Sequence, residues 1–415
     1  MVANLSAPEL RHLAAELARR GLLQVFVTRY ANQRRVWEQT LERLPVAGRI
    51  YSSTLGLRQP PAGIGVHHIV EAGIVFDFAA AIVARFRSLG SPVQYLGARL
   101  HQSTARAIGR TAAHLASRAP IIVAGSGAAL PAFEIAAKRG ALRVLNYPSA
   151  HHRFQQKFFA AAAKRQPEFA GLSEHDDIPL HLHEQLDQEC ALADLILTGS
   201  RFARNSFVAE GIPGAKVLAI PYGVDLSTFT PGTDAVSSRK FRITYVGRIS
   251  SRKGIGYLLH AYQRFCRPDT ELHLVGSIVG DGACLRPYAN LFVHSPHMPQ
   301  FKLLDIYRQT DVFVFPSLLE GLGLVVLEAM ACGCPVIVSA NGPCDVVRDG
   351  IDGLVVPAES SDALESALAR LYGDRVLRAS MAKAARIGAE AHSWNAYAAG
   401  AIDALLAVPS HQSAH

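Results

Sequence analysis

Residues Asp311–Pro335 read DVFVFPSLLEGLGLVVLEAMACGCP, and this stretch decides the fold. Its apolar run Val312–Phe315 predicts a buried strand, and the proline that follows predicts the start of a loop. A helix is expected from Gly323, because the apolar residues after it continue without a turn signal. Strand, glycine-containing loop and helix in this order are typical of one βα unit in a parallel sheet.

The same alternation recurs along the chain in two series. In the first series we predict strands at Gln24–Thr28, Ile64–Val70, Ile121–Ala124, Arg143–Tyr147, Leu195–Thr198 and Lys216–Pro221, and helices at Pro8–Arg19, Ala79–Ser88, Ser103–Ser117, Pro131–Arg139 and Glu184–Ala193. In the second we predict strands at Phe241–Val246, Glu271–Val275, Leu291–His294, Val312–Phe315 and Pro335–Ser339, and helices at Gly254–Arg267, Phe301–Arg308, Gly323–Ala331, Asp362–Tyr372, Val376–Glu390 and Ser393–Leu406. The chain is therefore expected to form two α/β domains, each built on a parallel sheet.

The domain boundaries follow from a loop rich in Gly and Pro between the two series. We predict a first domain over residues 1–222, a linker over 223–240 and a second domain over 241–390. Residues 391–415 are expected to form a last helix that packs back toward the first domain, followed by a polar tail. Ligands of doubly wound sheets bind outside the carboxyl ends of the strands, so a cleft between the domains is the expected site.

Composition limits the class of protein. The 415 residues are 49% hydrophobic and 18% charged, which is a globular composition. The six cysteines have no partners at metal-binding spacing, and we expect small buried side chains rather than a zinc site or disulfides. The most apolar window, Ala72–Phe86, contains Asp77 and is too short to cross a bilayer, and the first residues lack the apolar core of a signal peptide. We therefore expect a cytoplasmic protein.

The net charge of +8 is unevenly distributed. Residues 1–167 contain 22 Lys and Arg against 7 Asp and Glu, or about +15, whereas the rest of the chain sums to about −7. Nucleic acid is not the expected partner, because the arginines are scattered and accompany no nucleic-acid-binding motif. An anionic membrane surface at the inner face, an acidic glycan acceptor and a simple bias toward arginine remain open as explanations.

The loop that follows the strand Val312–Phe315 carries the most informative polar residues. Glycines on either side of Leu322 would let the backbone approach a ligand, and the N–H groups at the helix start suit an anion. Glu320 lies in this loop, and Glu328 follows inside an apolar helix, where it needs a hydrogen-bond donor. Two readings are open for the pair: ligand binding, or a helix cap at Glu320 with an arginine partner at Glu328.

The stretch resembles the Glu-x7-Glu signature of retaining glycosyltransferases of the GT-B fold, in family 4 of that class. Four further segments resemble the same family in the expected order: LILTGSRFARNSF at Leu195–Phe207, IPYGVDLSTF at Ile220–Phe229, ITYVGRISSRK at Ile243–Lys253 and GIDGLVVP at Gly350–Pro357. The resemblance covers residues 190–400 well and the earlier part only in general shape. It implies two Rossmann-like doubly wound domains that face a cleft.

The resemblance also implies roles for individual residues. Arg248 and Lys253 would hold the donor diphosphate and stabilise it as a leaving group. Glu320 would lie by the donor sugar and Glu328 would bind the ribose. Backbone N–H groups would contact the sugar and phosphate along Gly321, Leu322, Gly323 and Leu324. Leu322 replaces an aromatic residue that is usual in the family, and Val325 replaces a frequent proline, which leaves the donor preference open.

The first domain offers one further candidate. Asn146–His152 (NYPSAHH) follows a predicted strand, and related enzymes carry a histidine at about this point, near the donor sugar. Either His151 or His152 fills that role, or both are ordinary loop residues. The expected activity is transfer of a sugar from a nucleotide sugar to a glycan or lipid-linked acceptor, without a metal or other cofactor. A glycogen-phosphorylase-like enzyme and a catalytically silent sugar-binding subunit are the alternatives.

Overall fold

The computed structural model describes residues 1–4, 7–33, 35–44, 51–52, 62–84, 91–173, 180–232 and 240–408. Most of the predicted linker, residues 233–239, and the tail from residue 409 lie outside these ranges, as do residues 85–88 of the helix predicted at Ala79–Ser88. The chain divides into two compact units. Met1–Tyr147, Pro179–Leu197 and Ala398–His415 form the first, and Pro148–Ile178 and Thr198–Tyr397 form the second.

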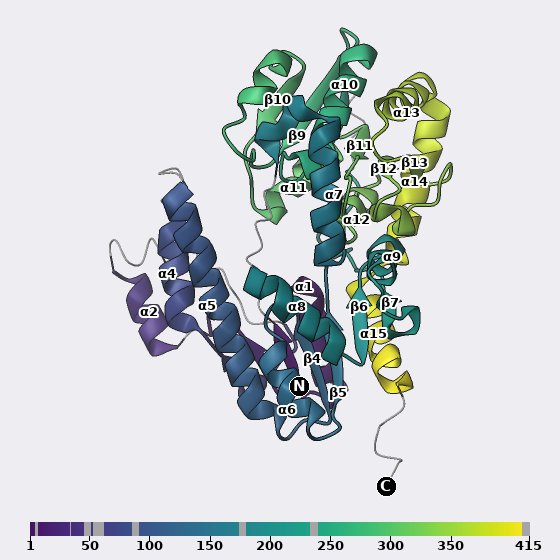
Figure 1. The fold of residues 1–415 in the computed structure, drawn as a ribbon. Coiled ribbons are helices and arrows are strands. Elements are labelled where there is room, and N and C mark those ends of the chain that lie inside the picture. Colours follow the sequence, from purple (N-terminus) through teal and green to yellow (C-terminus); the bar gives the residue numbers. More distant parts are fainter. Residues whose placement is uncertain are drawn as a thin grey trace. The chain divides into compact units, whose positions relative to one another are not determined.

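The first seven strands form one sheet in the order β3-β2-β1-β4-β5-β6-β7. They are β1 (Val2–Asn4), β2 (Phe26–Thr28), β3 (Ile69–Glu71), β4 (Ile121–Gly125), β5 (Leu142–Asn146), β6 (Leu195–Thr198) and β7 (Val217–Ala219). The helices of this half of the chain are α1 (Pro8–Arg19), α2 (Val36–Glu42), α4 (Ile74–Ala84), α5 (Ser91–Ala116), α6 (Leu130–Ala137), α7 (His152–Arg165), α8 (Leu180–Leu192) and α9 (Arg201–Ala209), with short 3-10 turns η2 (Val66–His68), η4 (Pro167–Leu172) and η5 (Gly214–Lys216). Figure 1 labels most of these elements.

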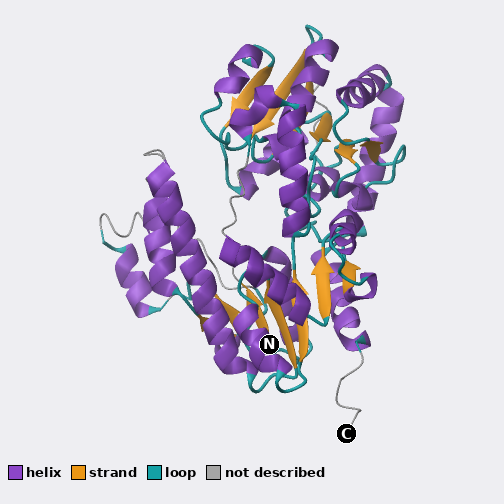
Figure 2. Cartoon of the chain, in the orientation of Figure 1, coloured by secondary structure: helices purple, strands orange, loops and turns teal. Residues whose placement is uncertain are grey.

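The second sheet has the order β10-β9-β8-β11-β12-β13, and its paired strands run parallel. Its strands are β8 (Phe241–Val246), β9 (Thr270–Val275), β10 (Phe292–Ser295), β11 (Val312–Phe315), β12 (Val336–Ser339) and β13 (Gly353–Val356). The remaining helices are α10 (Ile255–Phe265), α11 (Gln300–Arg308), α12 (Leu324–Ala331), α13 (Ser361–Gly373), α14 (Arg375–Glu390) and α15 (Trp394–Ala407), with 3-10 turns η6 (Ser251–Lys253), η7 (Ala283–Tyr288) and η8 (Pro343–Val346). Figure 2 shows the strands gathered in sheets with helices packed along them.

These features confirm the predicted α/β class with two parallel sheets. Both strand orders start from a central pair, β1 with β4 and β8 with β11, and grow outward on each side, which is the doubly wound arrangement. The central strand β11 is fully buried because its residues VFVF are apolar on both faces, as a strand covered by helices on both sides requires.

Several local predictions were wrong. The strand predicted at Ile64–Val70 is mostly the turn η2, and only its end enters β3. Helix α5 begins at Ser91, twelve residues before the predicted start at Ser103, and α4 begins at Ile74 rather than Ala79. Strands β1 and β13 and helix α7 were not predicted.

Candidate donor site in the second unit

The central strands β8 and β11 of the second sheet lie side by side, and the loops that follow them meet. Ile243 pairs with Val312 in the parallel register, so both strands deliver their loops to the same edge of the sheet. The N–H of Leu318 donates to the carbonyl of Arg252 at 2.8 Å, which joins the two loops. A point where strand order reverses is the usual ligand site of a doubly wound sheet.

Gly254 is required where these loops touch. It begins helix α10 with φ of +73°, and a Cβ at this position would lie 2.0 Å from the carbonyl oxygen of Pro316. A side chain would therefore be excluded both by the left-handed backbone and by the contact. The close approach places the preceding residue, Lys253, directly beside the loop that carries Glu320.

Lys253 and Glu320 form an ion pair at this edge of the sheet. Their side chains are only 11% and 15% exposed, and the ammonium group lies 4.8 Å from the centre of the Phe315 ring. Arg252 adds a second cation, with its guanidinium 3.5 Å from the carboxylate. Burial acts to raise the pKa of Glu320, but the charges of Lys253 and Arg252 outweigh it and hold that pKa below its ordinary value of 4.5.

The loop after Glu320 presents backbone donors. Gly323 adopts φ of +86° and begins α12 without a side-chain cap. Within the ranges that the structure describes, the N–H groups of Leu322, Gly323 and Leu324 donate to no protein acceptor. Such groups form an anion site at a helix start. Glu320 does not cap this helix, because the one backbone N–H among the described residues that donates to its carboxylate is that of Gly321, at 3.2 Å, which precedes the helix. The capping alternative is therefore wrong.

Glu328 lies inside α12 and is held by helix α11. The amide nitrogen of Gln300 donates to one carboxylate oxygen at 2.7 Å, and the hydroxyl of Tyr307 donates to the other at 2.8 Å. Burial raises the pKa of Glu328 above 4.5, and the two donors only partly offset it. The alternative of an arginine partner is therefore wrong for the part of the chain that the structure describes.

Arg248 and Arg252 lie on the same loop after β8 but in different surroundings. Arg248 lies on the loop after β8 with an exposed side chain, and its carbonyl accepts a hydrogen bond from the hydroxyl of Tyr245 at 2.6 Å. Arg252, which was not predicted as a site residue, lies beside Glu320 and donates to the carbonyl of Leu319 at 3.1 Å. The adjacent Arg-Lys pair in SSRK was the only sequence signal for it.

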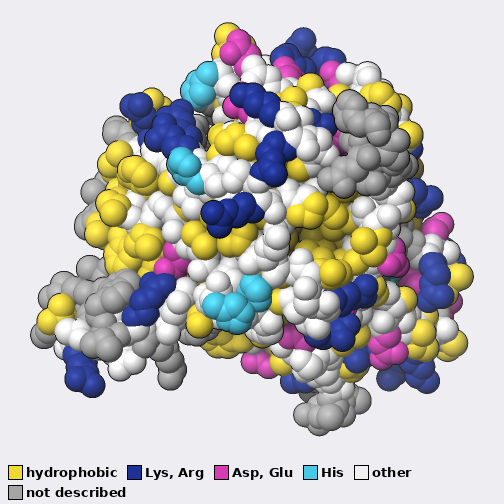
Figure 3. All heavy atoms as spheres, turned by 90° about the horizontal axis from the view of Figure 1, so that it is seen from below, with side chains coloured by type: hydrophobic (Ala, Val, Ile, Leu, Met, Phe, Trp, Pro, Cys, Tyr) yellow, Lys and Arg dark blue, Asp and Glu magenta, His cyan; other side chains and the backbone are white. Residues whose placement is uncertain are grey.

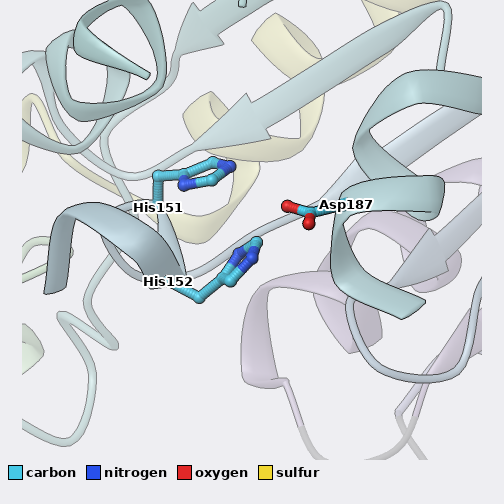
Figure 4. Close-up of side chains that lie close together, drawn as sticks. All are labelled: His151, His152 and Asp187. Atoms are coloured by element: carbon cyan, nitrogen blue, oxygen red, sulfur yellow. The ribbon is translucent and has the colours of Figure 1, made fainter. Parts of the chain in front are cut away.

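His151 and His152 stand at the start of helix α7 rather than in a loop. Both are buried, and their rings lie one against the other with centres 4.3 Å apart (Figure 4). His151 caps the helix, since its Nδ1 accepts from the N–H of Arg153 at 3.3 Å, while its own N–H donates to Ser206 at 2.8 Å. The third residue labelled in Figure 4, Asp187, lies on α8 in the first unit.

The segment that carries these histidines also reaches the loop of Glu320 within the second unit. A Cβ on Gly321 would lie 1.9 Å from the carbonyl oxygen of Pro148, so the backbones of the two loops are in contact. This explains why glycine is needed directly after Glu320. The structure thus brings the start of α7 and the loop of Glu320 together, whereas it leaves the chemical roles of His151 and His152 as predictions.

The fold class follows from comparison with solved structures. Solved structures with the GT-B architecture align with nearly the whole chain. A sucrose-phosphate synthase from Thermosynechococcus elongatus aligns at a TM-score of 0.58 and 22% identity, over 96% of this chain and 92% of that one. The Anabaena protein HepE, in complex with UDP and glucose, aligns at a TM-score of 0.61 and 16% identity, over 98% and 99%. The chain therefore has the GT-B fold.

The family follows from the sequence of the second half. Residues 233–387 match the family of glycosyl transferases group 1, so this segment is a domain of that family. A D-inositol 3-phosphate glycosyltransferase from Kribbella flavida is 32% identical over 53% of this chain and 58% of its own length. A GDP-mannose-dependent mannosyltransferase acting on phosphatidylinositol monomannoside, from Mycolicibacterium smegmatis, is 31% identical over 47% and 57%. The chain thus spans about half the length of the curated relatives that it matches.

Proposed function

We propose that the protein is a retaining glycosyltransferase, which moves a sugar from a nucleoside diphosphate sugar to a hydroxyl of a glycan or lipid-linked acceptor in cell-surface glycoconjugate synthesis. The observation that carries this proposal is the Lys253, Arg252 and Glu320 cluster beside the uncapped start of α12. Two cations and a row of backbone donors suit a diphosphate, and a carboxylate suits sugar hydroxyls. The family of residues 233–387 supports the same chemistry.

In this proposal the second unit binds the donor. Lys253, assisted by Arg252 and by Arg248 from the exposed end of the same loop, holds the diphosphate. The bond between the anomeric carbon and the diphosphate oxygen breaks, and the charge that develops on the leaving group is stabilised by these cations. The acceptor oxygen bonds to the same face of the anomeric carbon, and its proton passes to the leaving diphosphate. Retention of configuration rests on the family resemblance.

The two glutamates take different parts. Glu320 accepts hydrogen bonds from the donor sugar and supports positive charge at the anomeric carbon. Glu328 accepts from ribose hydroxyls, and each of its oxygens keeps acceptor capacity beside its bond to Gln300 or Tyr307. Neither a metal nor another cofactor is part of the proposal. The nucleotide stays open, because HepE was solved with UDP whereas the mycobacterial relative is named for GDP-mannose.

Calorimetric titration with UDP, GDP and ADP tests the donor site. We expect one of these nucleotides to bind, and Lys253→Ala to weaken that binding by about tenfold to a hundredfold, because a charge-assisted contact contributes about 1.5–3 kcal/mol. Arg248→Ala should weaken it in the same direction. Lys302→Ala removes an exposed lysine from α11 and serves as the matched control, with no expected change.

The proposal fails at its centre if neither Lys253→Ala nor Arg248→Ala changes the affinity while circular dichroism shows an intact fold. A catalytically silent subunit would bind the nucleotide and show the same losses, yet it would release no sugar from any donor. A phosphorylase-like enzyme would instead need a pyridoxal phosphate on a lysine, and its characteristic absorbance would appear in the purified protein.

A further inference from the structure

Helix α4 of the first unit is apolar on every side. Its sequence is IVFDFAAAIVA, in which Asp77 is the only polar residue. That carboxylate is buried and accepts the N–H of Tyr30 at 3.0 Å, so its charge faces inward. A surface helix of a globular protein normally carries polar residues on the face turned to water, and α4 carries none there.

The inward face of α4 is already used for packing. Ile74, Phe78 and Ala81, at helical spacing, pack against Tyr30 and Tyr51, and the rings of Phe78 and Tyr30 meet edge to face with centres 5.3 Å apart. The residues between them point elsewhere. Val75 is 77% exposed and Ile82 is 48% exposed, and Phe76 is exposed beside them. These side chains are not needed for the core that the structure describes.

The neighbouring helix α5 also has exposed apolar side chains near its start, and it adds charge. Tyr95, at 66% exposure, and Leu96 are exposed near its start. Arg99, Arg106 and Arg110 follow on the same helical stripe as Tyr95, and all three are exposed. The guanidinium of Arg99 lies 5.8 Å from the centre of the Tyr95 ring. Within the described residues none of the three arginines has a carboxylate partner.

We propose that this surface docks on an anionic lipid bilayer. The α4–α5 surface consists of Val75, Phe76, Ile82, Tyr95, Leu96, Arg99, Arg106 and Arg110. Apolar side chains would enter the interface between headgroups and acyl chains, the tyrosine would lie at headgroup level, and the arginines would bind phosphates. In Figure 3 hydrophobic side chains gather on the left of the drawn face, where Figure 1 shows α4 and α5, with basic side chains at their border.

A bilayer fits this surface better than a second copy of the chain. A two-fold contact would bring the same stripe of arginines against itself, which costs free energy. The surrounding sequence adds to that cost, because residues 1–167 sum to about +15. Anionic headgroups neutralise this charge instead. No helix among the described residues has the length and apolar character needed to cross a bilayer, so the contact would be peripheral.

Cosedimentation of the full chain with phosphatidylcholine vesicles, with and without phosphatidylglycerol, tests the proposal. We expect binding to the anionic vesicles at low salt that weakens at high salt. The triple substitution Arg99→Gln, Arg106→Gln and Arg110→Gln should lower the affinity on the order of a hundredfold, at about 1 kcal/mol per basic residue. Val75→Ser with Ile82→Ser should lower it at least about tenfold and at both salt concentrations, because this contribution is apolar.

Two matched controls distinguish binding through this surface from a general effect of exposed apolar residues or of positive charge. Val376→Ser with Ile387→Ser removes exposed apolar residues from α14, and Arg286→Gln, Arg370→Gln and Arg375→Gln removes three exposed arginines from the second unit. Both should bind vesicles like the unaltered protein. Absence of vesicle binding at low salt overturns the proposal, as does equal loss in control and test variants. A dimer in light scattering that Val75→Ser with Ile82→Ser converts to a monomer would also overturn it. The test requires no transferase activity.

Discussion

At the scale of single residues, Glu320 and Glu328 are opposite in their electrostatic surroundings. Lys253 and Arg252 stabilise the charged form of Glu320, so its pKa is lowered. Glu328 is buried with two neutral donors, so burial prevails and its pKa is raised. Eight residues apart on one βα unit, one carboxylate is therefore held as an anion and the other resists ionisation.

This contrast predicts opposite pH dependences of stability. For Glu320 the stabilising ionisation is complete above its ordinary pKa of 4.5 and is lost as the pH falls through the lower folded value. Glu320→Gln should therefore destabilise the protein more at pH 6 than at pH 3. For Glu328 the unfolded chain ionises first as the pH rises past 4.5, so Glu328→Gln should become relatively more stable from pH 4 to pH 6. Denaturant melts of both variants across this range are the measurement, and trends of equal sign would contradict the assigned environments.

At the scale of elements, the site depends on two loops that the sheet order brings together. Lys253 and Glu320 are 67 residues apart, and they meet because β8 and β11 are neighbours. Gly254 lets the two loops approach each other closely, because it has no Cβ. A second glycine, Gly350, has almost the same backbone conformation, with φ of +75°, but there is open space around its Cβ position. Substituting Gly350 therefore measures the cost of backbone strain alone, whereas substituting Gly254 measures strain together with the steric contact.

Gly350→Ala should cost about 1–2 kcal/mol, the usual penalty of a left-handed backbone for a residue with a Cβ. Gly254→Ala should cost this and roughly 1–3 kcal/mol more, because its Cβ would displace Pro316. It should also weaken nucleotide binding by displacing Lys253, whereas Gly350→Ala should leave binding unchanged. Urea denaturation and calorimetry measure both effects. Equal costs for the two substitutions would show that the loops can move apart freely.

The sequence predicted those strands and helices whose own residues carry a clear local pattern of hydrophobicity. Strands β8, β11 and β6 were predicted to the residue, because each is a short run rich in apolar and β-branched residues that a Gly or Pro ends. The three residues of β1 were too few to show any period, and η2 replaced a predicted strand at Val66–His68 because apolar residues at short range fit both structures. Arg252 was missed for a related reason, since its contact with Glu320 arises from strand neighbourhood and not from spacing.

At the scale of the whole molecule, chain order does not decide which unit a segment joins. Pro148–Ile178 lies between strands β5 and β6 in sequence, yet it belongs to the second unit. Phe169 of η4 explains this grouping, because its ring stacks on Tyr288 and meets His260 edge to face, each with centres 5.5 Å apart. Such contacts join residues about a hundred positions apart, and they cannot be predicted from the local pattern of a single sequence.

At this scale the proposed function requires the chain to release a sugar from a nucleotide donor and to transfer it with the help of Glu320. The direct measurement is the rate at which nucleoside diphosphate appears from a panel of UDP- and GDP-sugars, with and without candidate glycan or lipid-linked acceptors. We predict turnover with one donor, and a loss of at least about a hundredfold in kcat for Glu320→Gln with little change in donor affinity, because its contact strengthens in the transition state. Glu390→Gln, at a half-exposed carboxylate on α14, should keep the full rate. If Glu320→Gln, correctly folded, turns over the donor as fast as the unaltered protein, the proposed role of Glu320 is contradicted.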